Sequence, residues 1–137
     1  MTTFLDTNIL IYLLDSESSH HKWSVDQLDI CKQSGPAVIS DIVYCEFAVG
    51  METQADVDLA LSELAVERIA ATDTVLFRAA EAFRKYRDLK GQKNRVLPDF
   101  LIGAMAEVHD APLITNNSAD FETYFPKLVL IAPGETQ

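Results

Sequence analysis

The stretch TTFLDTNILIYLLD at residues 2–15 decides the fold class of this chain. Its apolar run at 3–5 predicts a short buried strand, and NILIYLL at 8–14 predicts a helix that follows after a turn. Asp6 stands directly after the strand. An aspartate there is a common helix N-cap, and it is also a candidate ligand, because ligands bind at the carboxyl ends of parallel strands. The stretch therefore predicts a strand–turn–helix unit with a carboxylate at the turn.

The rest of the chain repeats this alternation of short apolar runs with longer helical patterns. Further strands are predicted near 37–39, 68–70, 112–115 and 127–131, and further helices over about 20–33, 41–48 (capped by Asp41), 54–65, from 73 to the region of Gly91, and from Pro98 onward. Such alternation is typical of a parallel sheet with helices on both faces, so we expect an α/β fold, a three-layer α/β/α sandwich. We expect one domain over 1–132 and a short loose tail over 133–137.

The charge of the chain is strongly acidic but unevenly distributed. Its 137 residues carry 21 acidic and 11 basic side chains, a formal net charge of −10. This balance argues against a basic nucleic-acid-binding module and against adhesion to an anionic membrane. Six of the basic residues nevertheless lie within the segment 84–95, which we call the basic stripe. The stripe either tracks RNA phosphates, with Lys90, Lys93 and Arg95 as candidate contacts, or is a solvated helix end whose cations complement the helix dipole.

Cysteine usage and apolar runs indicate the compartment. Cys31 and Cys45 form neither a disulfide framework nor a CxxC pair, and no cluster of His and Cys offers the ligands of a structural zinc site. We expect both to be small reduced core residues. The chain starts without a basic segment before its first apolar run, and no apolar stretch approaches the roughly 20 residues that span a bilayer. These features predict a soluble cytoplasmic protein with no membrane partner.

Four carboxylates fall where this fold would bring side chains together. Asp6 and Asp120 each follow a predicted strand, and parallel strands end at one edge of a sheet. Glu46 and Asp99 lie on helices entered from that edge. Each acid alone has an ordinary explanation as a helix cap, a first-turn acid or a solvated helix residue. Four of them together would repel one another, and a divalent cation such as Mg²⁺ or Mn²⁺ would remove the repulsion.

The blocks around these acids resemble the PIN domain family, and within it the VapC-type toxin ribonucleases. The resemblance covers nearly the whole chain and rests on FLDTNILIYLLD at 4–15, SDIVYCEF at 40–47, PDFLIGAMA at 98–106 and LITNNSADFETY at 113–124. The resemblance implies a PIN-like fold and an endoribonuclease that depends on one or two Mg²⁺ or Mn²⁺ ions. It also implies that the protein is the toxin of a type II toxin–antitoxin pair.

The resemblance implies which acids form the site. Asp6, Glu46 and Asp99 match the three principal acidic positions of the family, as metal ligands and catalytic residues. Two alternatives remain for the fourth position. Asn117 occupies the usual place, whereas Asp120 occupies a place three residues further along that some members use. We favour Asp120 as the ligand, with Asn117 as a polar or water-mediated neighbour.

Hydroxyl and amide groups beside the acids are expected to orient them. Thr7 and Asn8 are expected to orient Asp6 by hydrogen bonds. Thr115 resembles the motif threonine of the family, and the resemblance implies that its hydroxyl contacts the metal ligands. The resemblance also implies an RNA substrate, a cognate antitoxin and a homodimer. The alternative function is a non-catalytic PIN-like scaffold that binds RNA or a protein partner, and the sequence leaves the identity of the RNA open.

Overall fold

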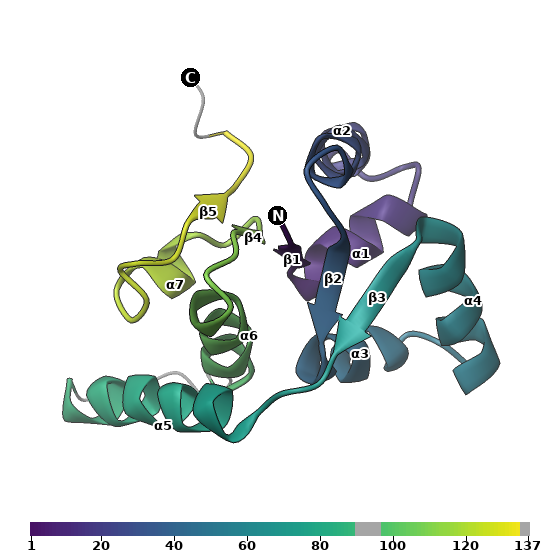
Figure 1. Ribbon diagram of the computed structural model, residues 1–137. Coiled ribbons are helices and arrows are strands. Elements are labelled where there is room, and N and C mark those ends of the chain that lie inside the picture. The colour runs from purple at the N-terminus through teal and green to yellow at the C-terminus, as the bar shows by residue number, and fades with distance from the viewer. Residues whose placement is uncertain (90–96, 135–137) are drawn as a thin grey trace.

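The structure is a computed structural model that describes residues 1–89 and 97–134. Within these residues strands and helices alternate along the chain, as the sequence predicts (Figure 1). In chain order they are β1 (Thr3–Leu5), α1 (Thr7–Leu14), α2 (His21–Lys32), β2 (Ala37–Ser40), α3 (Asp41–Ala48), α4 (Gln54–Leu64), β3 (Val66–Ile69), α5 (Asp73–Asp88), α6 (Leu97–Val108), β4 (Leu113–Ile114), α7 (Ala119–Glu122) and β5 (Leu130–Ile131).

The described strands form one parallel sheet in the order β3-β2-β1-β4-β5. β1 lies in the middle, where its Phe4 pairs with Val38 of β2 on one side and with Leu113 of β4 on the other. The chain builds outward from β1 to β2 and β3, and then returns to build β4 and β5. The winding therefore reverses between β1 and β4, and a crevice opens there outside the carboxyl ends of the strands.

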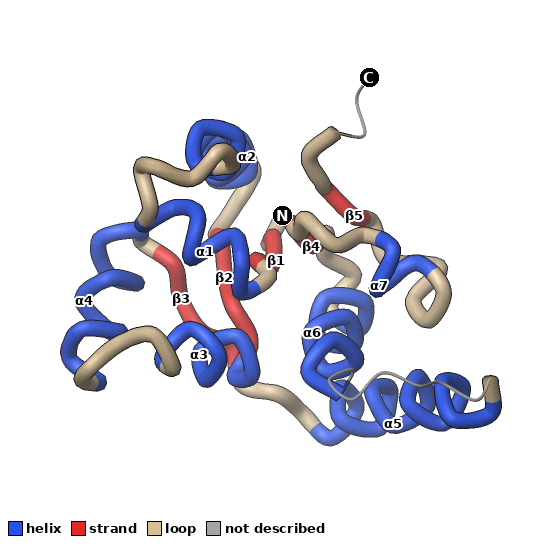
Figure 2. Tube along the Cα trace, turned by 180° about the vertical axis from the view of Figure 1, so that it is seen from behind, coloured by secondary structure: helices blue, strands red, loops and turns tan. Residues whose placement is uncertain are grey.

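Helices flank the sheet in two groups. Seen from opposite sides in Figure 1 and Figure 2, α1 to α4 gather around β2 and β3. On the other side α6 and α7 lie near β4 and β5, and α5 packs against α6. A parallel sheet between helices buries both of its faces at the centre, which explains why β1 and β2 are mostly apolar and buried throughout. β3 lies at the edge of the sheet, and its Glu67 and Arg68 are exposed. The predicted α/β sandwich is confirmed.

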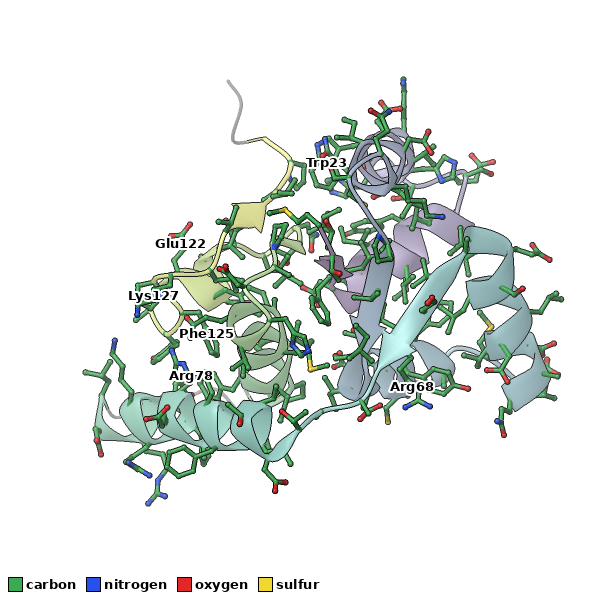
Figure 3. All side chains as sticks on the ribbon, in the orientation of Figure 1. Trp23, Arg68, Arg78, Glu122, Phe125 and Lys127 are labelled. Carbon is green, nitrogen blue, oxygen red and sulfur yellow. The ribbon has the colours of Figure 1, made fainter. Side chains whose placement is uncertain are left out.

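Arg78 of α5 holds the second group of helices together. Its Nε donates a hydrogen bond of 2.6 Å to Glu107 Oε1 on α6, and its Nη2 donates one of 2.8 Å to the carbonyl oxygen of Tyr124, which follows α7. The guanidinium also lies over the Phe125 ring, 4.8 Å from the ring centre (Figure 3). One side chain therefore connects α5, α6 and the segment after α7.

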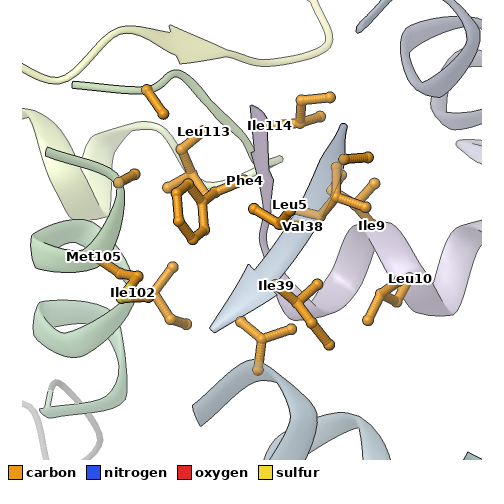
Figure 4. Close-up of a cluster of buried hydrophobic side chains, with 14 of the residues drawn as sticks. Phe4, Leu5, Ile9, Leu10, Val38, Ile39, Ile102, Met105, Leu113 and Ile114 are labelled. Atoms are coloured by element: carbon orange, nitrogen blue, oxygen red, sulfur yellow. The ribbon is translucent and has the colours of Figure 1, made fainter. Parts of the chain in front are cut away.

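β1 is the centre of the hydrophobic core. Neighbouring residues of a strand point to opposite faces of the sheet. Phe4 lies on the side of Ile102 and Met105 of α6, while Leu5 lies beside Ile9 of α1 (Figure 4). All five side chains are at most 2% exposed. Because burial of apolar surface is the main stabilising contribution to folding, this packing places the carboxyl end of β1 firmly.

The start of α3 differs from the prediction that Asp41 caps it. The Ser40 hydroxyl accepts a hydrogen bond of 3.4 Å from the Val43 backbone N–H, so Ser40 is the N-cap. Asp41 is the first residue of the helix, and its carboxylate accepts hydrogen bonds from Arg68 at 2.5 Å and from the Ala71 backbone N–H at 3.2 Å. Serine and aspartate are both good N-caps, and here the contact with β3 decides between them.

Other local expectations are wrong, among them the following three. Cys31 is buried as expected, but Cys45 is exposed on α3. The segment around Asp120, where no helix is predicted, contains the short helix α7. The strand predicted near 68–70 begins earlier, at Val66. A four-residue helix is too short to show a helical period in the sequence, and strand ends depend on pairing with neighbouring strands.

Several expectations fall at the margin of the described residues. Lys90, Lys93 and Arg95 of the basic stripe lie outside them, as do residues 135–137 of the expected tail. Helix α5, expected to reach the region of Gly91, ends at Asp88. Among the helices that the structure describes, none is long and apolar enough to cross a membrane.

Candidate functional site

A polar cavity of about 410 Å³ lies at the carboxyl ends of β1 and β4. This is the place where the winding of the sheet reverses, and where ligands bind in open parallel sheets. Segments far apart in the sequence contribute its lining, which consists of Asp6, Thr7, Asn8, Ile11, Glu46, Asp99, Asn117 and Asp120. The structure therefore brings the four predicted carboxylates to one cavity.

Asp6 is both a helix cap and a member of the cavity lining. Its Oδ1 accepts a hydrogen bond of 2.8 Å from the Thr7 backbone N–H, and its Oδ2 accepts one of 2.7 Å from the Thr115 hydroxyl. Only 6% of the residue is exposed. Burial raises the pKa of Asp6, the charges of Glu46 and Asp120 raise it further, and the two hydrogen bonds oppose the shift. The ionised carboxylate is thus poorly solvated where it stands.

Thr7 connects two of the acids. While its backbone N–H donates to Asp6, its hydroxyl donates a hydrogen bond of 2.6 Å to Glu46 Oε1 on α3. The expected contact with Asp6 is therefore made by the main chain, and the side chain orients a second acid. Because α1 packs against α3, the first residue of one helix can reach the side of the other.

Thr115 supports the cavity from the end of β4. It is completely buried, and its hydroxyl donates to Asp6 Oδ2 while accepting a hydrogen bond of 3.0 Å from the Asn117 backbone N–H. The second bond turns the chain directly after the strand. The turn brings the exposed Asn117 into the lining, next to the first turn of α7.

Buried aromatic neighbours fix the helices that carry Asp99 and Asp120. Phe100, the residue after Asp99, is 2% exposed, and Phe121, the residue after Asp120, is completely buried. The Phe100 ring also contacts the Tyr124 ring edge to face, with 5.2 Å between their centres. Each of the two acids is therefore held at the cavity by the buried aromatic residue that follows it in the sequence.

The side-chain amide of Asn8 does not orient Asp6 as expected. It donates a hydrogen bond of 3.4 Å to Asn116 Oδ1, and Asn116 Nδ2 donates one of 2.5 Å to the Tyr12 hydroxyl. Tyr12 and Asn116 are not among the residues that the sequence predicts beside the site. The spacing of Asn8 and Tyr12 places both on one face of α1, but it contains no signal for a partner in the segment after β4.

The donor set of the cavity suits a hard divalent cation. Carboxylate and amide oxygens are the ligands of Mg²⁺, and a cation would neutralise the buried charge of Asp6. As the side chains stand, no three Asp, Glu, His or Cys side chains of residues 1–89 and 97–134 lie close enough to hold an ion. The acids nevertheless fit a divalent ion by their chemistry and by the cavity that they share.

Comparisons with known proteins identify relatives of this chain. The sequence model of the PIN domain matches residues 3–124. Ribonuclease VapC10 of Mycobacterium tuberculosis is 31% identical over 123 residues, which cover 88% of this chain and 86% of that protein. The residues that the PIN domain model matches include the whole described lining of the cavity.

Solved structures share the fold. A VapBC2 structure from Rickettsia felis, bound to a DNA fragment from its promoter, aligns with a TM-score of 0.76 and 22% identity over 96% of this chain and 98% of that chain. A toxin–antitoxin complex from Klebsiella pneumoniae aligns with a TM-score of 0.67 and 27% identity over 97% of this chain and 98% of that chain. Because the domain match spans most of its length, this chain belongs to the PIN domain family.

Proposed function

We propose that this protein is an endoribonuclease that depends on Mg²⁺ or Mn²⁺ and hydrolyses phosphodiester bonds of RNA, as the toxin of a toxin–antitoxin pair. The observation that carries the proposal is the single cavity lined by Asp6, Glu46, Asp99 and Asp120. Family membership supports it, because a relative with 31% identity is named a ribonuclease and a structural relative is a toxin–antitoxin complex.

Each acid of the cavity has a role in this proposal. Asp6 and Asp99 would be the main ligands of one or two ions, with Asp120 completing the set and Glu46 acting as a ligand or as the group that orients the attacking water. A bound divalent ion supplies a water of lowered pKa and a positive charge that stabilises the leaving oxygen. Thr7 and Thr115 hold Asp6 from two sides, so that it need not reorganise when substrate arrives.

A catalytic role explains the burial of Asp6 better than a scaffold role. A buried carboxylate with a raised pKa opposes folding at neutral pH, and a scaffold that only binds RNA or protein gains nothing from it. A metal-dependent nuclease needs this group, because strained or poorly solvated groups persist where function requires them.

The decisive experiment compares cleavage of RNA by the wild type and by Asp6→Asn and Asp99→Asn variants. Asp26→Asn is the matched control, because Asp26 carries the same charge on α2, where its side chain is 51% exposed and pairs with Lys22. We expect the wild type and Asp26→Asn to cleave with Mg²⁺ or Mn²⁺ and not with a chelator. Folded Asp6→Asn and Asp99→Asn should be inactive with either metal.

Wild-type rates of metal-dependent cleavage from a folded Asp6→Asn/Asp99→Asn double variant would refute the proposed site. Absence of both cleavage and Mn²⁺ binding in the wild type would instead favour the non-catalytic scaffold. Circular dichroism of each variant separates loss of the site from loss of the fold.

The proposal includes a cognate antitoxin, a homodimer and a cytoplasmic location. The acidic cavity would attract a basic side chain of the antitoxin by a charge-assisted hydrogen bond. Co-purification with the product of an adjacent small reading frame tests the antitoxin, and light scattering of the purified protein tests the dimer. Lys90, Lys93 and Arg95 are proposed to contact RNA phosphates ahead of the cavity, and all three lie outside the described residues.

A further inference from the structure

A single asparagine amide joins α1 to the segment that follows β4. Asn116 uses both ends of its side chain, since Oδ1 accepts from Asn8 Nδ2 at 3.4 Å and Nδ2 donates to the Tyr12 hydroxyl at 2.5 Å. Asn8 and Tyr12 are four residues apart on α1 and therefore share a face of the helix. The amide thus fastens the segment 115–118 to that face.

Two histidines contact Tyr12 and fix its position. Its ring packs against the His20 ring, with 4.8 Å between the ring centres, and its carbonyl oxygen accepts a hydrogen bond of 2.8 Å from His21 Nδ1. His20 lies in the connection between α1 and α2, and His21 is the first residue of α2. The Tyr12 hydroxyl is therefore an acceptor in a fixed place, which makes the bond from Asn116 an anchor for the segment after β4.

The residues on either side of Asn116 belong to the cavity. The Thr115 hydroxyl bonds Asp6, and Asn117 lines the cavity. The Asp120 backbone N–H donates a hydrogen bond of 3.0 Å to the Asn117 carbonyl oxygen, so the position of Asp120 follows that of Asn117. A change in the anchoring of Asn116 is thereby passed to two groups that face Asp6.

We propose that Tyr12 and Asn116 are positioning residues, which hold Asn117 and Asp120 in place opposite Asp6. The inference rests on the proposed function, because it assigns them an effect on the metal-binding and cleaving site. As far as the described residues form it, the lining of the cavity includes neither of the two, so both act through others. Groups that orient metal ligands in this way typically change metal affinity by about 10- to 100-fold when removed.

The test compares Tyr12→Phe with Tyr44→Phe. Both variants lose one hydroxyl and keep the ring. The Tyr44 hydroxyl donates a hydrogen bond of 2.8 Å to Asp58 on α4, away from the cavity lining, so Tyr44→Phe is the matched control. Asn116→Leu is a second variant, which keeps a side chain of similar size and removes both hydrogen bonds of the amide.

Three measurements report on the proposal. Hydrogen exchange of the metal-free proteins should become faster at the Asn117 and Asp120 amides in Tyr12→Phe, with β1 amides unchanged. Calorimetric titration should show Mn²⁺ binding about tenfold weaker. The kcat for RNA cleavage at a fixed, subsaturating Mn²⁺ concentration should fall with little change in KM. Asn116→Leu should show the same changes, and Tyr44→Phe should match the wild type throughout.

The outcomes separate this inference from the proposed function. If the wild type binds Mn²⁺ and cleaves RNA while Tyr12→Phe and Asn116→Leu do so equally well, the positioning role is overturned and the proposed function stands. Faster exchange with unchanged Mn²⁺ affinity would show a structural clamp only, which also overturns it. If the wild type neither binds Mn²⁺ nor cleaves, the proposed function fails and the positioning role fails with it.

Discussion

At the scale of single residues, Asp6 both caps a helix and lines the acidic cavity. One carboxylate oxygen caps α1, and the other is held by the buried Thr115 hydroxyl. The cap alone would be satisfied at the surface, where most N-caps lie and where the charge would be solvated. Burial beside Glu46 and Asp120 raises the pKa of Asp6 instead. The free energy of unfolding therefore differs between a solvated N-cap at the surface and the buried carboxylate of Asp6, and this difference can be measured.

We predict that Asp6→Asn stabilises the metal-free protein at pH 7. A raised pKa in the folded state means that the folded protein binds this proton more tightly than the unfolded chain does. The charged form therefore lowers the free energy of unfolding above the folded-state pKa, and this loss disappears as the pH falls toward the unfolded value. Thermal unfolding should show a higher Tm for Asp6→Asn at pH 7, with the difference shrinking on acidification.

The comparison with the wild type at each pH isolates Asp6 from the other acids of the chain. A lower Tm for Asp6→Asn at pH 7 would show that its hydrogen bonds outweigh the burial of its charge. With saturating Mn²⁺ the order should reverse, because only the wild type gains stability from metal binding by mass action.

At the scale of elements, the packing of α6 against the segment after α7 decides how Asp99 and Asp120 face each other. A Cβ atom on Gly103 of α6 would lie 2.4 Å from Cε2 of Phe125. The Phe125 ring is 1% exposed and lies under the Arg78 guanidinium, so it has no free space into which to move. Glycine is therefore required at this helix position by close approach, not by backbone conformation.

Gly103→Ala should lower the free energy of unfolding by about 1–3 kcal/mol, the usual cost of overpacking a core. Gly50→Ala is the control, because the nearest atom to its added Cβ is the Phe47 carbonyl oxygen at 3.9 Å. That variant should be neutral or slightly stabilising, since alanine restricts the unfolded chain. Urea denaturation measures both, and equal stability of the two variants would contradict the close packing of α6 on Phe125.

At the scale of the whole molecule, the net charge of −10 and the acidic cavity both oppose an RNA partner in the absence of cations. In the proposed function, divalent ions neutralise the cavity, and the basic stripe supplies local positive charge near Asp99 in the sequence. RNA affinity should therefore increase with Mn²⁺ and decrease with monovalent salt. A basic protein would show only the second dependence.

Replacement of Lys90, Lys93 and Arg95 by Gln should weaken RNA binding and flatten its salt dependence. Each phosphate contact with a single strand contributes about 0.7 to the slope of log K against log salt, so the slope should fall by about 2. Rapid-mixing anisotropy measures binding before cleavage occurs. Lys22→Gln, which removes a surface ammonium paired with Asp26, should leave the slope unchanged. An unaltered slope in the triple variant would favour the solvated helix end.

The sequence by itself determined the layer architecture and the meeting of the four acids. Strand and helix periods are local patterns, and parallel strands end at one edge, so Asp6 and Asp120 could be placed together without knowledge of packing. Glu46 and Asp99 lie on predicted helices entered from that edge, and the resemblance then matched Asp6, Glu46 and Asp99 to the principal acidic positions of the family.

Only the tertiary structure decided which partner each supporting group contacts. The Thr7 hydroxyl bonds Glu46, the Asn8 amide bonds Asn116, and the Tyr12 hydroxyl completes the chain of contacts. The tertiary structure also decided that Ser40 and not Asp41 caps α3, and that Cys45 is exposed. Each depends on the distance between elements remote in sequence, which is set by how side chains pack in the core and is not encoded in any local pattern.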